Sequence, residues 1–206
     1  MIKGFALASV LLLLIIGEVL SETQAPEQFS CILEITRTEL GKSENVTINI
    51  HRSWSPIGVD RFYTLIKEEK YYDDSGFFRV LPGFVVQFGI AADPAKSAKW
   101  KDLKIKDDKV AKSNVRGTIS FATAGANTRT TQLFINYGNN SRLDGMGFAP
   151  FGEVSSEEDM KILDSIYSKY GQSPSQNEIY SEGNKYLKEN YPKLDYIKHL
   201  SIKNTN

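Results

Sequence analysis

The residues from Gly76 to Gly89, with the sequence GFFRVLPGFVVQFG, constrain the fold more than any other part of the chain. Two short runs rich in Phe and Val are joined by Pro82-Gly83, a dipeptide typical of tight turns. Runs of this composition favour β-strands, in which successive side chains alternate between two faces. We therefore predict a pair of adjacent strands over Phe77–Leu81 and Phe84–Phe88.

Alternation gives this strand pair one wholly apolar face, which we assign to the core: it holds Phe78, Val80, Val86 and Phe88. The same alternation places Phe84 on the core face. Arg79 and Gln87 lie on the opposite face, among apolar neighbours, and two interpretations of the arginine are open. Either it pairs with a nearby carboxylate or extends its alkyl stem to water, or it is a donor directed at a ligand.

The N-terminal residues have the composition of an export signal. A basic Met1-Ile-Lys precedes the apolar run Gly4–Gly17, which is shorter than the roughly 20 residues that span a bilayer. This pattern predicts a secretory signal peptide over residues 1–25, cleaved after Ser21 or Ala25, with an uncleaved anchor as the alternative. Residues 26–206 then form one domain with a sizeable core, located in the endoplasmic reticulum lumen or secreted.

Composition excludes several classes of function. Lys plus Arg and Asp plus Glu are both 25, and this balance argues against a nucleic-acid partner. Cys31 is the only cysteine, so no intrachain disulfide forms; we expect a small buried apolar residue, with an intermolecular bridge as the alternative. His51 and His199 stand alone, without metal-ligand spacing, so we expect no metal and no cofactor. Nothing indicates an oligomer, and we expect a monomer without membrane contact after cleavage.

Periodicity predicts the remaining elements. Strands are expected over Phe29–Arg37, Val46–Ile50, Gly117–Ala122, Thr131–Asn136 and Tyr196–Ile202. Helices are expected over Ile57–Lys70, from a capping-box-like start at Ser156 to the break at Gly171–Ser175, and over Asn177–Tyr191. The lysine-rich segment Ala91–Lys112 is expected to be a solvated connection, with a basic loop for an acidic partner as the alternative.

Three further residues fall on the non-core side of their strands: the small Ala122, the amide Gln132 and the aromatic Phe134. Together with Arg79 and Gln87 they suggest an apolar surface edged by hydrogen-bonding groups. That is the general composition of a ligand pocket. A face covered by a loop would have the same pattern, so both interpretations are open.

Three blocks, FFRVLPGFVVQFG, RGTISFATAGANTRTTQLFIN and LDGMGFAPFGEV, occur in one order and resemble the cyclophilin-type peptidyl-prolyl cis–trans isomerases. The resemblance covers Phe29 to Ile202, and the segments GFAPFG and YLKENYPKLDYIK are similar to a prokaryotic-like branch. It implies a mainly β fold, a closed eight-stranded antiparallel β-barrel capped by two α-helices. It also implies an enzyme without cofactor that accelerates rotation about X–Pro bonds, here in unfolded secretory proteins.

The resemblance further implies roles for individual residues. Arg79 is the catalytic arginine, and Gln87 and Gln132 hold it and the peptide backbone. The pocket for the proline ring is lined by Phe84, Val85, Phe134 and Leu143. Ala122 and Thr123 support the residues that precede proline.

Two positions depart from the family pattern. Arg142 stands where many members have an aromatic residue, and Gly147-Phe148 stands where they have a histidine, with Phe148 as an apolar substitute. The first departure removes a group that cyclosporin uses, so we expect weak inhibition by cyclosporin. Both departures favour the alternative function, a proline-binding module or chaperone with little turnover. A β-domain that binds carbohydrate or protein without regard to proline is a third hypothesis.

Overall fold

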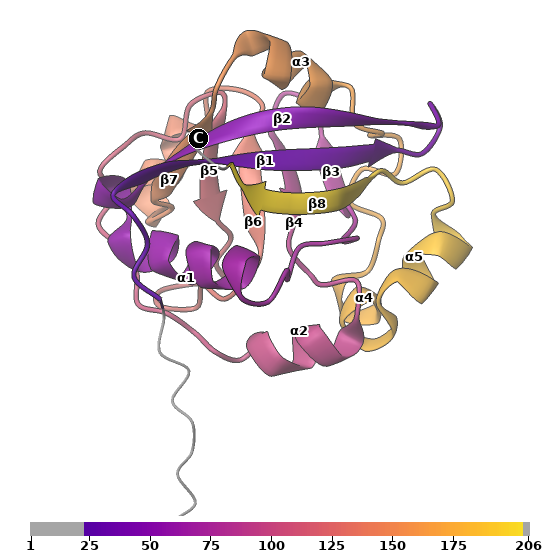
Figure 1. Ribbon diagram of the computed structural model, residues 1–206, viewed down its shortest axis with the longest axis horizontal. Helices are drawn as coiled ribbons and strands as arrows, with labels where there is room; N and C mark the ends of the chain where they lie inside the picture. Colours follow the sequence, from indigo (N-terminus) through magenta and orange to yellow (C-terminus); the bar gives the residue numbers. More distant parts are fainter. Residues whose placement is uncertain (1–22, 204–206) are drawn as a thin grey trace, which may run out of the picture.

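The computed structural model describes residues 23–203, so most of the expected signal peptide lies outside the described residues. Eight antiparallel strands form one curled sheet in the order β3-β4-β6-β5-β7-β2-β1-β8 (Figure 1). The strands are β1 (Gln28–Arg37), β2 (Lys42–His51), β3 (Arg79–Leu81), β4 (Val85–Phe88), β5 (Thr118–Phe121), β6 (Leu133–Asn136), β7 (Pro150–Val154) and β8 (Tyr196–Ile202). The prediction of a mainly β fold with eight antiparallel strands is confirmed.

The sheet ends at β3 and β8, so the expected full closure into a barrel is not confirmed. One isolated bridge, between Gly76 and Tyr196, brings the segment before β3 against β8. The backbone N–H of Phe77 donates to the carbonyl of Asp195 at 3.1 Å beside this bridge. Part of the gap is therefore spanned by a loop, which protects the sheet edge without a continuous ladder.

Five α-helices occur in residues 23–203, more than the two expected as caps. They are α1 (Pro56–Lys67), α2 (Pro94–Trp100), α3 (Glu157–Asp164), α4 (Gln176–Glu182) and α5 (Asn184–Asn190), with 3₁₀ turns η1 (Arg52–Trp54) and η2 (Ser141–Met146). In Figure 1, α3 lies beside β2 and α1 lies near β8, so these two helices flank the sheet. The other three gather at one corner, where α4 contacts both α2 and α5.

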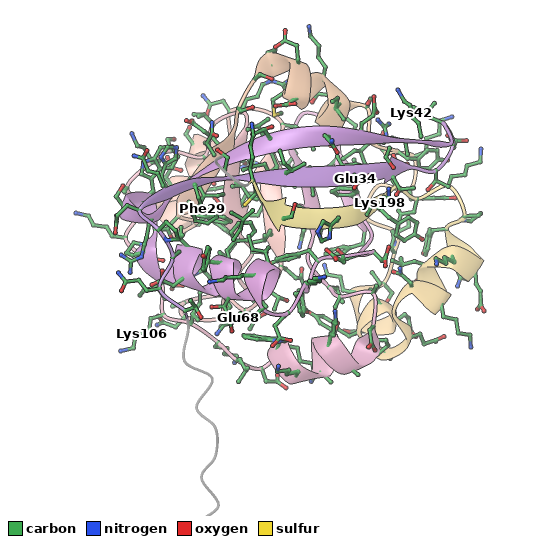
Figure 2. All side chains as sticks on the ribbon, in the orientation of Figure 1. Phe29, Glu34, Lys42, Glu68, Lys106 and Lys198 are labelled. Atoms are coloured by element: carbon green, nitrogen blue, oxygen red, sulfur yellow. The ribbon has the colours of Figure 1, made fainter. Side chains whose placement is uncertain are left out.

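The main core combines apolar side chains of the curled sheet with those of the two flanking helices, such as Phe62 of α1 and Leu163 of α3. Strands β1 and β2 alternate buried and partly exposed residues, as the sequence pattern predicts. The outer face of β1 and its neighbour β8 carries polar pairs such as Glu34 of β1 and Lys198 of β8, whose Oε1 and Nζ atoms lie 2.8 Å apart (Figure 2). Cys31 is fully buried in this core, as expected, and burial raises the pKa of its thiol.

The strand alternation predicted before Arg79 is wrong. Phe77 packs in the main core, whereas Phe78 belongs to a second apolar cluster that includes Ile179 and Leu187. The reason is that β3 begins only at Arg79, so Phe77 and Phe78 are not strand residues and do not obey its alternation. Instead, Phe78 supports the corner formed by α4 and α5.

The segment Ala91–Lys112 is also more ordered than expected. It contains α2, whose Trp100 is 1% exposed, so the interpretation as a solvated connection is wrong. Asp108 is buried as well, and its carboxylate accepts hydrogen bonds from the N–H groups of Ile57 and Gly58 at the start of α1. This carboxylate therefore caps the helix from a distant part of the chain.

The single helix predicted over Asn177–Tyr191 is divided in two at Gly183. Gly183 has a φ of +61°, and a Cβ atom there would collide with the carbonyl oxygen of Ala92. The carbonyl of Ala92 also accepts a hydrogen bond from Asn184 N–H at 3.0 Å. The close approach of the loop before α2 thus requires glycine and ends α4.

Two negative findings apply to residues 23–203. None of the helices there combines the length and the apolar character needed to cross a bilayer. No group of three or more His, Cys, Asp or Glu side chains in the same range is arranged to hold a metal ion.

Candidate active site

A cavity of about 290 Å³ opens beside β3, β4 and β6. Nine of the ten site residues expected from the sequence line it, together with two that were not expected, Gln172 and Gln176. The lining residues are Arg79, Phe84, Val85, Gln87, Ala122, Thr123, Phe134, Leu143, Phe148, Gln172 and Gln176. The tenth expected residue, Gln132, borders an adjoining cavity.

The floor of the cavity is apolar. Val85, Phe134 and Leu143 are buried against one another and form a cluster separate from the main core. Phe148 packs on Phe134 edge to face, with ring centroids 5.6 Å apart. The register of β4 and β6 sets Gln87 opposite Phe134, so one strand pair supplies both the apolar floor and its polar edge.

The polar edge is a chain of hydrogen bonds that begins at Arg79. The Nη1 group of Arg79 donates to Gln87 Oε1 at 3.2 Å, because the two residues lie directly opposite in the β3–β4 ladder. Gln87 Nε2 in turn donates to Gln132 Oε1 at 2.8 Å. Gln132 Nε2 then donates to Gln176 Oε1 and to the hydroxyl of Tyr180, at 2.9 and 3.0 Å. This series of hydrogen bonds fixes the orientation of each side-chain amide.

The guanidinium of Arg79 is held by neutral groups. Besides Gln87, it contacts Gln172, whose Oε1 accepts from Arg79 Nε at 3.3 Å, and the ring of Phe84, whose centroid lies 5.6 Å from Cζ. Among the described residues, none of the ion pairs involves Arg79. The interpretation that a carboxylate holds this arginine is therefore wrong within that range, and its charge is available at the cavity edge.

Phe84 does not lie in the core, contrary to the alternation argument. It precedes β4 and closes the Pro82-Gly83 turn, in which its N–H donates to the carbonyl of Leu81 at 2.9 Å. The turn frees Phe84 from the strand's alternation and places its half-buried ring on the cavity wall. A second cation, Arg142, lies over the same ring, with Cζ 4.8 Å from the centroid.

The 3₁₀ turn η2 positions Leu143 through its neighbour Asp144. The Asp144 carboxylate accepts hydrogen bonds from the backbone and side-chain amides of Asn114, both at 2.8 Å, and from the hydroxyl of Ser113. Burial by itself raises the pKa of Asp144, but these hydrogen bonds outweigh it and hold the pKa below the ordinary value. The charged carboxylate thus ties one wall of the cavity to the loop before β5.

A second cavity, of about 310 Å³, adjoins the first. Gln87, Ala122, Thr123 and Gln176 line both cavities and so form the boundary between them. The second cavity is more polar and is completed by Lys101, Ala124, Thr128, Thr130 and Gln132. An extended chain can therefore lie across the boundary with side chains in both cavities.

Sequence reasoning missed Gln172, Gln176 and Tyr180. Gln172 lies in the break after α3, and the other two lie in α4. No local periodicity marks them, since an amide in a turn or on a short helix is ordinary surface composition. Only the tertiary structure brings Gln172, in the loop after α3, to Arg79, and Gln176 and Tyr180, in α4, to Gln132.

An apolar hollow edged by one cation and a row of amides defines a class of protein, a β-sheet domain that binds an extended peptide. The lining residues include no carboxylate, histidine or cysteine, and the hydroxyl of Thr123 is bonded to Gly125 and Thr128 and to no base within residues 23–203. The cavity can therefore orient a ligand and stabilise charge, but it offers no activated nucleophile. A reaction suited to such a site breaks no covalent bond.

Comparison with known proteins identifies the family. The family model of cyclophilin type peptidyl-prolyl cis-trans isomerases matches residues 33–183. A peptidyl-prolyl cis-trans isomerase of Helicobacter pylori strain J99 is 32% identical over 122 residues, which cover 59% of this chain and 74% of the relative. The isomerase ppi1 of Schizosaccharomyces pombe is 36% identical over 126 residues, covering 58% and 76%.

A solved structure has the same fold. It is a cyclophilin type peptidyl-prolyl cis-trans isomerase of Cryptosporidium parvum in the presence of the dipeptide Ala-Pro, with a TM-score of 0.61 at 20% identity. The alignment covers 85% of this chain and 99% of that structure. The chain described here belongs to the cyclophilin-type peptidyl-prolyl cis–trans isomerase family. The main function expected from the sequence, isomerisation of X–Pro bonds, is confirmed at this level.

Proposed function

We propose that the cavity binds a proline ring of an extended peptide and that Arg79 catalyses rotation of the preceding amide bond. Rotation is slow without help because nitrogen's lone pair is delocalised into the carbonyl, which gives a barrier of about 18–20 kcal/mol. A donor directed at the prolyl nitrogen favours the pyramidal nitrogen that occurs only midway through rotation. Such a contact stabilises the transition state more than either isomer.

The setting of Arg79 is the observation that carries this proposal. Its guanidinium stands at the edge of an apolar cavity, oriented by Gln87 and Gln172 and free of any carboxylate within residues 23–203. An arginine suits the role because it stays charged and presents its donors in one fixed plane. In this proposal Phe134 and Leu143 hold the ring still, and Ala122 and Thr123 support the residues before proline. The Cryptosporidium relative was solved in the presence of Ala-Pro, a dipeptide that contains the type of X–Pro amide bond proposed here as the substrate.

We further propose that the clients are unfolded proteins of the secretory pathway, reached after removal of an N-terminal signal peptide. Of the two cleavage positions expected, the one after Ser21 is favoured. Ala25 is 4% exposed, its N–H donates to Asp60 Oδ1 at 2.9 Å, and Thr23 N–H donates to Thr64 Oγ1 at 2.9 Å. Cleavage after Ala25 would remove both contacts with α1. N-terminal sequencing of the protein from its own cells should therefore begin at Glu22.

The activity is tested by NMR exchange on a short X-Pro-Phe peptide. The wild-type protein should accelerate cis–trans exchange. Arg79→Ala should raise the barrier of the catalysed step by about 2–4 kcal/mol, which is the cost of removing one hydrogen-bond donor from the oxyanion hole of other enzymes. Unchanged thermal unfolding of the variant is the control. Binding of the peptide without accelerated exchange would instead support a proline-binding module, the alternative that Arg142 and Phe148 suggest.

A further inference from the structure

Arg142 is an exposed cation that packs on Phe84, one of the residues that line the proposed proline site, and lies just outside the lining itself. Its guanidinium lies over Phe84, the same ring that Arg79 contacts, so two positive charges lie against one lining residue of the cavity. Its one hydrogen bond in the described structure is long, from Nη1 to Asn140 Oδ1 at 3.4 Å. Arg142 thus keeps nearly all of its donors free.

The described residues provide no carboxylate for either arginine. Asp144, two positions along from Arg142, is already occupied by Ser113 and Asn114. Two cations close to an apolar surface, with no anion between them, create a local positive potential that attracts an anionic group. A peptide carboxylate beside Phe84 would supply the negative charge that the two arginines lack, and it would accept hydrogen bonds from the guanidinium of Arg142.

The arrangement of the two cavities indicates which part of the peptide passes Arg142. Ala122 and Thr123 border both cavities, and in the proposed function they support the residues before proline. Phe84 and Leu143 line the first cavity only. The chain after proline therefore leaves across Phe84 and meets Arg142.

We propose that Arg142 determines substrate specificity by selecting peptides with an acidic residue directly after proline. This inference rests on the proposed function, since it takes the direction of the bound peptide from it. Arg142 acts here as a specificity-determining residue that contacts the substrate side chain and leaves the rotation step to Arg79. The preferred substrate class is Pro-Glu or Pro-Asp segments.

The test measures kcat/KM by NMR exchange on matched peptides that differ in one residue. One pair carries Glu or its neutral isostere Gln directly after proline, and a second pair carries Glu or Gln directly before it. At low salt the wild-type protein should prefer Glu over Gln about fivefold after proline, as expected for one partly exposed charge-assisted contact. The preference should largely vanish at about 1 M salt.

Three variants identify the source of the preference. Arg142→Ala should reduce the Glu-to-Gln ratio after proline to about one, and Arg142→Glu should invert it. Lys161→Ala, which removes one exposed charge from α3 far from the cavity, should leave the ratio unchanged. Because Arg142 is exposed, its variants should fold, and circular dichroism checks that they do.

Each outcome has one meaning. A ratio near one in the wild-type protein, a ratio that survives Arg142→Ala, or an equal preference before proline overturns the inference and leaves the isomerase function standing. If the wild-type protein accelerates exchange in none of the four peptides, the proposed function fails and the inference fails with it.

Discussion

Gln172 accepts a hydrogen bond from the Arg79 guanidinium at 3.3 Å, although 93 residues separate the two in the chain. The contact joins the loop after α3 to β3. A backbone hydrogen bond of 2.9 Å from Val80 N–H to the Gly171 carbonyl holds the same loop in place. Arg79 is therefore oriented from two sides, by Gln87 within the sheet and by Gln172 from outside it.

Replacement of Gln172 should reduce activity without affecting stability. Gln172→Ala removes one of two orienting acceptors, and we expect kcat/KM to fall about fivefold, the equivalent of one hydrogen bond of about 1 kcal/mol. Gln172→Glu should reduce it further, because the new carboxylate forms an ion pair with the guanidinium and competes with the prolyl nitrogen. Lys169→Ala, an exposed change in the same loop, is the control. Full activity of Gln172→Glu would show that Arg79 needs no free charge.

Asp144 should make the site sensitive to acid. Its pKa is lowered in the folded protein, so its stabilising contribution is complete above the ordinary value near 3.8 and is lost as pH falls through the folded pKa. Asp144→Asn should therefore lower the free energy of unfolding at pH 7 by about 1 kcal/mol and have little effect near pH 2. Urea unfolding at the two pH values measures this, and an equal effect at both would contradict the assignment.

Gly183→Ala should destabilise the protein. The residue has a positive φ, and a methyl group would press against the Ala92 carbonyl, so we expect a loss of about 1–3 kcal/mol in the free energy of unfolding. Because Gly183 ends α4, the change should also shift Gln176 and Tyr180 away from Gln132. Gly125→Ala, at a positive-φ turn with open space around it, should cost less. Thermal unfolding of both variants makes the comparison.

Cyclosporin should inhibit weakly. In the family resemblance, Arg142 replaces the aromatic residue that the inhibitor uses, and in the structure its guanidinium occupies the space over Phe84. Arg142→Trp should therefore strengthen inhibition, which titration of the inhibitor against NMR exchange can measure. Nanomolar inhibition of the wild-type protein would show that Arg142 does not stand at that position.

The sequence predicted much of the candidate site because the relevant signals are local. The β3–β4 and β6 segments each carry an alternation of polar and apolar residues, and this alternation alone predicts that Arg79, Gln87, Gln132 and Phe134 lie on one side of the sheet. The prediction failed where the backbone leaves the strand. Phe84 lies in a turn and Phe78 precedes β3, so neither follows the alternation on which the prediction rested.

The sequence by itself thus determined the strands, their faces and, through its motif blocks, the family of isomerases to which the chain belongs. Only the tertiary structure decided what surrounds Arg79: neutral acceptors from Gln87 and Gln172, and a shared aromatic ring with Arg142. The physical reason is the separation along the chain between the residues that interact. A strand's alternation repeats every two residues and is visible locally, whereas contacts across 93 residues depend on how distant segments pack together.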